Sequence, residues 1–521
     1  MSAGSPEAGS YPAGPGGGDA SRWYAGEVLA EPTSTASIDL PDTWEGPREE
    51  CGVFGIYAPG SDVSRLTYFG LYALQHRGQE SAGIAAADRG SFIITQRALG
   101  LVSQVFKEHD LRALGGELAI GHVRYSTTGS NEWENSQPVH RTAGNGRRRE
   151  IALAHNGNLT NAVELHAELR AEGVEFTSTS DSEIIAALIA EQPDEAIEDA
   201  VAAVVPRLKG AFSTVIMTNE RVLAFRDPAG VRPLVLGRIG EHYCVASESC
   251  ALDIIGAEYM RDVLPGELIS IGEDGIRTRM LVEGEREAFC VFEYIYFARP
   301  DSRMNDTSLQ AARGRMGEVL AREAPAPGAD LVIAIPDSGN AAARGYARGS
   351  GLPQDDGFVK NRYVARTFIQ PGQELRKHGL RLKFNPLPEI VGGRKLVVVD
   401  DSIVRGNTMR QIIQMLREAG ALEVHLRISA PPIRHPCYYG VDMSTREEMV
   451  AHERTVEEVA EHVGADSLAY LSLDGVYEAI GGEPADHCDA CFSGKYPLPG
   501  PGQGTGKFSL EEELPMARSS A

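Results

Sequence analysis

Long apolar runs are missing from this sequence of 521 residues. A bilayer-spanning helix needs about 20 consecutive apolar residues, and no segment approaches that length. The N-terminus also lacks the basic and apolar regions of a secretory signal. Basic residues are a minority, with 50 Lys and Arg against 73 Asp and Glu, and the net charge of -23 disfavours binding to nucleic acid or to an anionic membrane. We therefore expect a cytoplasmic globular protein that captures small anionic ligands at local sites.

Cysteine is also scarce, at seven residues in the whole chain. A reducing cytosol keeps thiols free, so these cysteines are poorly explained as a disulfide framework and favour catalytic or metal-binding roles. Cys244 and Cys250 lie in apolar surroundings and are interpreted as small core side chains.

The composition changes along the chain and predicts its organisation. Residues 1–50 are rich in Gly, Pro, Ser and Ala and are predicted to be disordered. Strand-like runs alternate with helical stretches over 51–285, which predicts a layered α+β domain. Over 286–496 buried strands alternate with helices, which predicts an α/β domain with a parallel sheet and ligands beyond the carboxyl ends of its strands. The Gly/Pro-rich tail, 497–521, is predicted to be flexible.

The segment KLVVVDDSIVRGNTMRQII, 395–413, predicts a site for a sugar phosphate. A buried strand ends on Asp400 and Asp401, and a helix begins near Asn407. Unpaired N–H groups at a helix N-terminus can hold a phosphate. The adjacent carboxylates would repel that phosphate unless they bind sugar hydroxyls or Mg²⁺. A plain polar turn is the alternative, but it leaves most of the string unexplained.

These residues resemble the type I phosphoribosyltransferases, which bind 5-phosphoribosyl 1-diphosphate (PRPP). The resemblance implies that Asp400 and Asp401 contact the ribose hydroxyls and that an earlier loop, with Ser338 and Gly339, takes the diphosphate. It also implies Mg²⁺ near Ser338, Asp400 and Asp401. The residues expected to hold the 5-phosphate lie in the loop after the strand: Ser402, Arg405, Gly406, Asn407 and Thr408.

A basic stretch, 360–372, resembles the mobile loop that closes over PRPP in that family. It carries Lys360, Arg362 and Arg366, and Lys360 is expected to contact PRPP. Closure would exclude water, which would otherwise react with a developing ribosyl cation. The alternative is a solvated basic loop without a ligand.

The first domain carries five motifs in a fixed order: CGVFGI, LQHRGQESAGI, GHVRYST, HNGNLTN and TSDSE. Their order and spacing resemble the class II glutamine amidotransferases, which are N-terminal-nucleophile (Ntn) hydrolases. The resemblance implies an αββα sandwich over 51–285 and a glutamine-splitting site with Cys51 as its nucleophile.

Further roles in this site follow from the same resemblance. Arg124 would pair with the glutamine carboxylate and Asp181 with its α-ammonium. Asn156 and the N–H of Gly157 would form the oxyanion hole. Each role suits the residue type, although singly Arg124 could be a surface ion-pair residue and Asn156-Gly157 a turn.

Three histidines accompany the motifs, His76, His122 and His155, and are expected to be structural. No catalytic His is needed if the α-amine of Cys51 acts as the base. An internal Cys51 has an amide in place of that amine. We therefore expect residues 1–50 to be a propeptide that is cleaved between Glu50 and Cys51.

Four further cysteines, Cys290, Cys437, Cys488 and Cys491, suit either zinc or a [4Fe-4S] cluster, and spacing does not decide between them. His487 could replace one thiolate in a zinc site. One branch of the glutamine PRPP amidotransferases carries both a propeptide and a four-cysteine [4Fe-4S] cluster in matching contexts, and this resemblance favours iron–sulfur. The cluster would be structural and sensitive to oxygen.

Together the two halves imply that ammonia from glutamine attacks C1 of PRPP and opens purine synthesis through 5-phospho-β-D-ribosylamine. The family implies a homotetramer with feedback inhibition by purine nucleotides.

Two alternative functions remain. A glutamine–fructose-6-phosphate aminotransferase would share the first half but carry a sugar-isomerase domain instead of the PRPP motif. A PRPP- or redox-sensing regulator would keep both folds without turnover.

Overall fold

The computed structural model describes residues 51–126, 129–143, 149–192, 196–284, 286–361, 380–381, 383–443, 445–501 and 509–513. All of these residues lie in one compact unit. The expected propeptide, 1–50, and most of the expected closing loop, 362–372 with Arg362 and Arg366, lie outside the described residues. Within the described part of the chain, no helix combines the length and apolarity that crossing a membrane requires.

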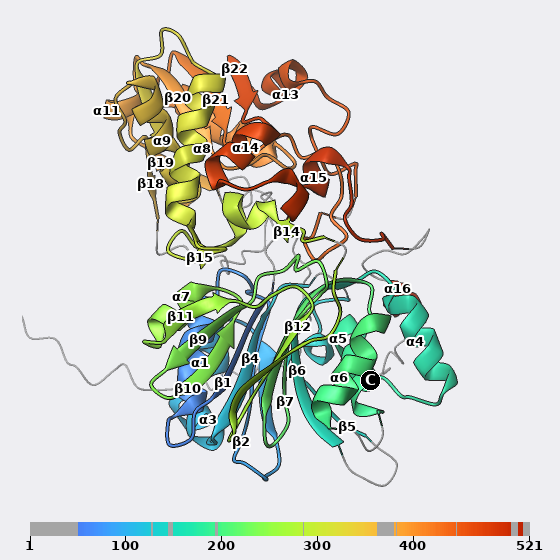
Figure 1. Cartoon of the computed structure of the whole chain (residues 1–521). Coiled ribbons are helices and arrows are strands. Elements are labelled where there is room, and N and C mark those ends of the chain that lie inside the picture. Colours follow the sequence, from blue (N-terminus) through green and yellow to red (C-terminus); the bar gives the residue numbers. More distant parts are fainter. Residues whose placement is uncertain are drawn as a thin grey trace, which may run out of the picture. The chain divides into compact units, whose positions relative to one another are not determined.

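Two antiparallel sheets form the first half (Figure 1). The seven-stranded sheet has the order β11-β9-β10-β1-β4-β2-β3 and the six-stranded sheet the order β13-β12-β8-β7-β6-β5. The strands of the first are β1 (Gly52–Tyr57), β2 (Ser81–Ala87), β3 (Ile94–Leu99), β4 (Leu118–Arg124), β9 (Val235–Ile239), β10 (His242–Ala246) and β11 (Glu258–Asp262). Those of the second are β5 (Val139–Ala143), β6 (Arg149–Leu159), β7 (Gly210–Met217), β8 (Val222–Arg226), β12 (Glu267–Gly272) and β13 (Gly275–Met280).

The two sheets pack face to face, and helices cover their outer faces. Successive side chains of β1 point to opposite faces of its sheet, which is why both faces are covered. Val53 packs in the core between the two sheets, whereas Phe54 packs in the core beneath the helices. The first sheet is covered by α1 (Val63–Ala73) and α7 (Ser249–Ile254), with α2 (Val102–Val105) and α3 (Glu108–Ala113) beside them. The second is covered by α4 (Ala162–Ala171), α5 (Asp181–Ala190) and α6 (Ile197–Val204). The predicted αββα sandwich is confirmed.

The second half is built on a parallel sheet with the order β17-β20-β21-β22. Its central strand, β20, has three consecutive valines that are fully buried, as expected for a strand covered on both faces. The strands are β17 (Leu331–Ala334), β20 (Lys395–Asp400), β21 (Glu423–Ile428) and β22 (Ser467–Tyr470). The helices are α8 (Leu309–Glu323), α9 (Asn340–Ser350), α12 (Asn407–Glu418), α13 (Val456–Val463) and α14 (Leu473–Ile480). The predicted α/β phosphoribosyltransferase fold is confirmed.

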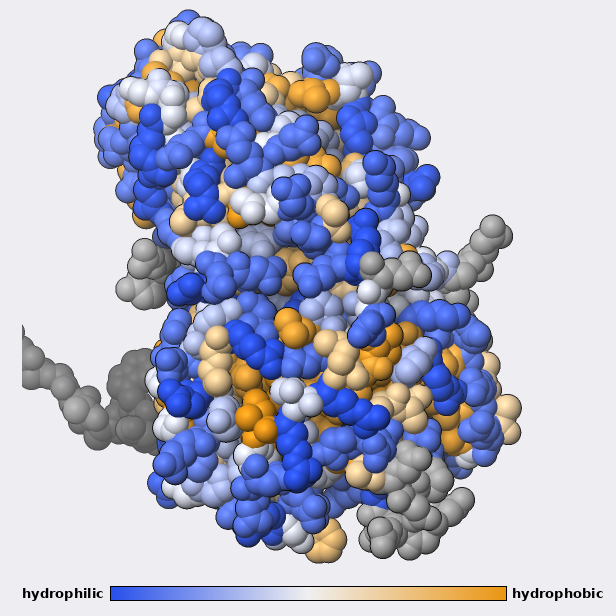
Figure 2. All heavy atoms as spheres, viewed as in Figure 1, coloured by the Kyte–Doolittle hydropathy of each residue, from blue (hydrophilic) through white to orange (hydrophobic). Residues whose placement is uncertain are grey.

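Short elements connect and flank these layers. Strand β14 (Phe289–Cys290) pairs in parallel with β23 (His487–Cys488), so that Cys290 lies opposite Cys488. Other short elements are a π-helical turn (Glu293–Phe297), β15 (Arg303–Met304), β16 (Thr307–Ser308), β18 (Phe358–Lys360), β19 (Phe384–Pro386), α11 (Pro388–Val391), α15 (Ala490–Ser493) and three 3-10 turns (Trp133–Asn135, Val205–Arg207 and Pro484–Asp486). Hydrophilic residues cover most of the surface seen in Figure 2, in keeping with the charge of the chain.

The C-terminal tail differs from its prediction. Within 497–521, which the composition predicts to be flexible, Ser509–Glu513 form a helix, α16. Leu510 is only 3% exposed and belongs to the core beneath α4 and α5. One buried leucine in a five-residue helix gives too little hydrophobic periodicity for sequence analysis to detect.

Candidate functional site

Cys51 immediately precedes β1, a central strand of the first sheet, and is 5% exposed. Its thiol donates a hydrogen bond to the carbonyl of Tyr125, at 3.3 Å, and its own carbonyl accepts one from Nε of Arg77, at 3.1 Å. Burial raises the pKa of the Cys51 thiol to about 11, against the opposing effect of Arg124. A buried thiol with so high a pKa is protonated at neutral pH and needs a base to become a nucleophile.

Two charged residues predicted to hold glutamine lie close to this thiol, since the charges of Arg124 and Asp181 both act on its pKa. Arg124 ends β4 and Asp181 begins α5, and both are at most 3% exposed. Burial raises the pKa of Asp181, but His155, the N–H of Leu159 and Arg124 outweigh it, so that the pKa lies below its usual value. The structure therefore presents a buried cation, Arg124, and a buried anion, Asp181, near Cys51, together with Glu80, which lies 3.8 Å from Arg124.

Asn156 and Gly157 follow each other in β6. Asn156 is 1% exposed, and within the described residues its side-chain Nδ2 has no hydrogen-bond partner. Gly157 has a φ of 151°, and a Cβ there would lie 2.0 Å from the carbonyl oxygen of Ala211. No other residue fits this position. A buried amide donor without a partner is available for an oxyanion.

The three motif histidines contact neighbouring strands and helices. His76 Nε2 lies 2.6 Å from Glu248, and His122 Nε2 lies 3.1 Å from the carbonyl oxygen of His155. His155 Nδ1 lies 3.7 Å from Asp181. Burial lowers the pKa of His122 to about 3, so this imidazole is neutral at physiological pH. These contacts agree with structural roles.

At the end of β20, Asp400 and Asp401 are 8% and 5% exposed. Ser338 donates a hydrogen bond to Asp400, at 3.1 Å, which joins the end of β20 to the loop after β17. Burial and the charge of Asp401 raise the pKa of Asp400 well above its usual value, and burial also raises the pKa of Asp401. Two such carboxylates are suited to a cation or to sugar hydroxyls, either of which offsets the loss of water.

Two loops surround this carboxylate pair. Gly339 immediately precedes α9, and a Cβ there would lie 2.4 Å from the carbonyl oxygen of Val399, so the loop after β17 passes directly against β20. Gly406, with a φ of 86°, precedes α12, whose first residues are Asn407 and Thr408. The N-termini of both helices therefore lie at the same edge of the sheet.

The remaining predicted PRPP residues lie around these loops. Ser402 donates to the carboxylate of Asp401, and Arg405 pairs with Glu448 at 2.9 Å. Lys360 ends β18 and pairs with Asp337, in the loop predicted to take the diphosphate. Ser338 and Gly339 thus meet the end of β20, which continues into the Ser402–Thr408 loop, and Lys360 meets the loop that carries Ser338.

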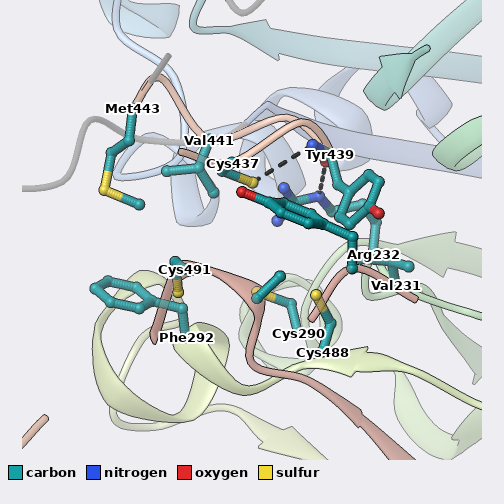
Figure 3. Close-up of a pocket in the computed structure, with 12 residues that line it drawn as sticks. Val231, Arg232, Cys290, Phe292, Cys437, Tyr439, Val441, Met443, Cys488 and Cys491 are labelled. Carbon is teal, nitrogen blue, oxygen red and sulfur yellow. Dashed lines mark hydrogen bonds between the residues drawn. The ribbon is translucent and has the colours of Figure 1, made fainter. Parts of the chain in front are cut away.

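All four cysteines predicted to hold a cluster line one cavity (Figure 3). Burial raises the pKa of Cys491 well above its usual value, and Cys290, Cys437 and Cys488 raise it further. Within the described residues, no three Cys, His, Asp or Glu form a group that could hold a single metal ion. The other lining residues are Val231, Arg232, Phe292, Tyr439, Val441, Met443, Ala490 and Tyr496.

Sequence analysis missed a buried charge network between the halves. Arg77 is 1% exposed overall, and its guanidinium bonds to Glu248 and Glu293, each at 2.6 Å. Glu293 begins the π-helical turn of the second half, and its carbonyl accepts a hydrogen bond from Arg313. Arg77 lies within the LQHRGQESAGI motif, but nothing in the spacing predicts that it meets Glu293, 216 residues away.

The cavity lined by the four cysteines also touches the first half, because Val231 and Arg232 belong to its lining. Asn158, next to Gly157, donates a hydrogen bond to the carbonyl of Tyr438, at 3.0 Å. Arg232 donates to the carbonyl of Tyr439, at 2.6 Å, a contact drawn in Figure 3. The residues that follow Cys437 therefore pack against the strand of the candidate oxyanion hole.

Known proteins share this sequence and this fold. A family described as the glutamine amidotransferase domain matches residues 122–253. The amidophosphoribosyltransferase of Mycobacterium tuberculosis is 50% identical over 489 residues, 91% of this chain and 92% of that protein. The Synechocystis enzyme of the same name is 51% identical over 87% of this chain and 92% of its own length. The solved glutamine PRPP amidotransferase of Bacillus subtilis, complexed with ADP and GMP, is 44% identical and covers 87% of this chain and 99% of its own, with a TM-score of 0.82.

Proposed function

The chain belongs to the amidophosphoribosyltransferase family, and from this premise we propose that it converts glutamine and PRPP to 5-phospho-β-D-ribosylamine, glutamate and diphosphate. One observation carries the proposal: a buried thiol near Arg124 and Asp181, and a buried carboxylate pair beside the loops that lead into α9 and α12, occur in one compact unit. This reaction opens purine synthesis.

In the first half, removal of residues 1–50 gives Cys51 a free α-amine that accepts the thiol proton. The thiolate then attacks the side-chain amide of glutamine, ammonia leaves, and water later releases glutamate from the thioester. Arg124 holds the glutamine carboxylate and Asp181 its ammonium group. Asn156 and Gly157 donate hydrogen bonds to the oxyanion as it forms.

In the second half, Asp400 and Asp401 hold the ribose hydroxyls, and the Ser402–Thr408 loop holds the 5-phosphate. Ser338, Gly339 and Lys360 hold the diphosphate, and Ser338, Asp400 and Asp401 are the proposed site of Mg²⁺, which offsets diphosphate charge. Ammonia attacks C1 and diphosphate leaves. Free ammonia can also enter this site directly, so an ammonia-dependent reaction isolates the second half.

Ammonia must pass from Cys51 to C1 without protonation, and we propose a channel that forms when the 360–372 loop closes over PRPP. The decisive assay measures glutamate release with and without PRPP, with a Cys51→Ser variant as its control. We expect PRPP to stimulate glutaminase, and we expect the variant to lose glutamine-dependent product but keep ammonia-dependent product. Full glutaminase without PRPP would refute the coupling, and a wild type inactive with both nitrogen sources would refute the proposed function.

Removal of the propeptide has its own test. Intact mass and N-terminal sequencing of active protein should show a chain that begins at Cys51. Fully active protein that retains residues 1–50 would contradict the role of the α-amine.

The cysteine cavity is the proposed site of a [4Fe-4S] cluster, because thiolates are its usual ligands and four thiols line one cavity. The cluster would hold Cys290, Cys437, Cys488 and Cys491 together, a stabilising role. Anaerobically purified protein should be brown, with iron and sulfide in equal amounts. A colourless protein that contains zinc would reject this assignment.

Regulation and location complete the proposal. The Bacillus subtilis relative was solved with ADP and GMP, which supports inhibition of this chain by purine nucleotides. We also propose a homotetramer, which sedimentation would test. We also propose a cytoplasmic location, because the seven cysteines are assigned to catalytic, cluster-binding or core roles and not to disulfides.

A further inference from the structure

The C-terminal segment Ser509–Glu513 packs on the first half, although it follows the second half in sequence. Helix α16, formed by this segment, contacts α4, and Figure 1 draws the two side by side. Leu510 is 3% exposed within the core of α4 and α5. The leucine fixes the segment, so the neighbouring Glu511 has a defined position.

Glu511 bonds to the loop that follows β4. Its Oε1 accepts a hydrogen bond from the N–H of Ser130, at 2.5 Å. The carbonyl oxygen of Ser130 accepts hydrogen bonds from Nη1 of Arg124, at 3.1 Å, and from Nδ2 of Asn135, at 3.0 Å. One residue, Ser130, therefore links Glu511 to the guanidinium assigned to the glutamine carboxylate.

The same loop also reaches the other charged residue of the site. Oδ1 of Asn135 accepts a hydrogen bond from the N–H of Thr179, at 2.9 Å, two residues before Asp181. Gly129 has a φ of 76°, and a Cβ there would lie 2.8 Å from Oγ1 of Thr179. The loop around Ser130 thus lies between the segments that carry Arg124 and Asp181.

We propose that Glu511 is a positioning residue of the glutamine site, an inference that rests on the proposed function. By holding the N–H of Ser130, its carboxylate fixes the carbonyl to which Arg124 bonds. Arg124 is then already oriented when glutamine arrives, and less conformational entropy is lost on binding. The C-terminal segment acts on glutamine affinity and leaves PRPP chemistry unchanged.

The test compares Glu511→Ala and Glu511→Gln with the wild type. A lost charge-assisted hydrogen bond should raise the KM for glutamine about ten-fold in Glu511→Ala, with little change in kcat. Glu511→Gln keeps an acceptor oxygen and should restore much of the loss. A chain ending at Pro501 should resemble Glu511→Ala. Glu164→Ala, which removes an exposed carboxylate from α4, is the matched control.

Two further measurements separate positioning from general damage. The ammonia-dependent reaction should be the same in every variant. Hydrogen exchange in peptides covering 129–135 should be faster in Glu511→Ala, because the amide of Ser130 loses its acceptor. A glutamine KM within two-fold of the wild type, an equal loss of the ammonia reaction, or unchanged exchange would each overturn the proposal. If the wild type has no glutaminase, the proposed function fails and the exchange result alone decides whether Glu511 holds the loop.

Discussion

His122 illustrates at the residue scale how burial controls charge in the first half. Its ring is fully buried, and burial lowers the pKa to about 3 from the usual 6.5. Between these two values the unfolded chain binds a proton that the folded chain does not. Above pH 6.5 the burial of His122 does not change the free energy of unfolding. As the pH falls below 6.5, it lowers that free energy, by roughly 2 kcal/mol at pH 5.

Replacing His122 should remove this dependence. In His122→Gln, urea unfolding between pH 7 and pH 5 should show a smaller loss of stability than in the wild type, by roughly that amount. The exposed His109→Gln is the control and should lose stability as the wild type does. An equal loss in His122→Gln and the wild type would show that His122 takes up its proton in the folded protein.

Sequence analysis assigns roles to individual residues where a motif fixes them. Cys51, Arg124 and Asn156 receive their roles from motifs, and each of these residues is buried in the structure. Arg77 lies in the same motifs but received no role. Its function depends on a partner, Glu293, that is remote in sequence, and local patterns carry no information on such a pairing.

At the scale of elements, the approach of the β17–α9 loop to β20 permits only glycine at position 339. In Gly339→Ala the new Cβ would lie 2.4 Å from one backbone oxygen and 2.9 Å from another, and neither can move freely. The loop with Ser338 should be displaced from Asp400. We expect PRPP-dependent activity to fall at least about ten-fold with either nitrogen source, because both reactions use this loop.

Steady-state kinetics in PRPP would measure this loss, and Gly115→Ala provides the comparison. Its Cβ would meet only one atom, at 3.9 Å, so it should behave as the wild type. A Gly339→Ala enzyme with unchanged KM for PRPP would mean that the diphosphate binds elsewhere.

Elements were predictable where hydrophobic periodicity is strong. The valine-rich strand and the helix from Asn407 follow directly from the sequence. Helix α16 was missed because its stability comes from tertiary packing of Leu510 and not from local propensity.

For the whole molecule, the Arg77 network offers a path between the two active sites. Arg77 bonds to the carbonyl of Cys51, and Glu293 connects it to Arg313, whose charge partly opposes the rise that burial causes in the pKa of Asp401. In Glu293→Gln the shape is kept but one charge is lost. We expect PRPP to stimulate glutaminase several-fold less, while the ammonia-dependent reaction persists.

Glu267→Gln is the matched control, because Glu267 is a buried partner of Arg261 within the first half alone. It should retain PRPP stimulation. Equal stimulation in Glu293→Gln and the wild type would exclude this network as the connection.

The burial of Arg77 also limits how this enzyme could be rebuilt. Arg77 and Glu248 come from one half and Glu293 from the other, and all three side chains are removed from water. A chimera that joined this glutamine-splitting half to a different acceptor half would lack Glu293. The buried guanidinium of Arg77 would then lose one of its two carboxylate partners. Burying a mismatched charge is strongly destabilising. Any exchange of halves must therefore transfer a carboxylate at the position of Glu293 along with the fold.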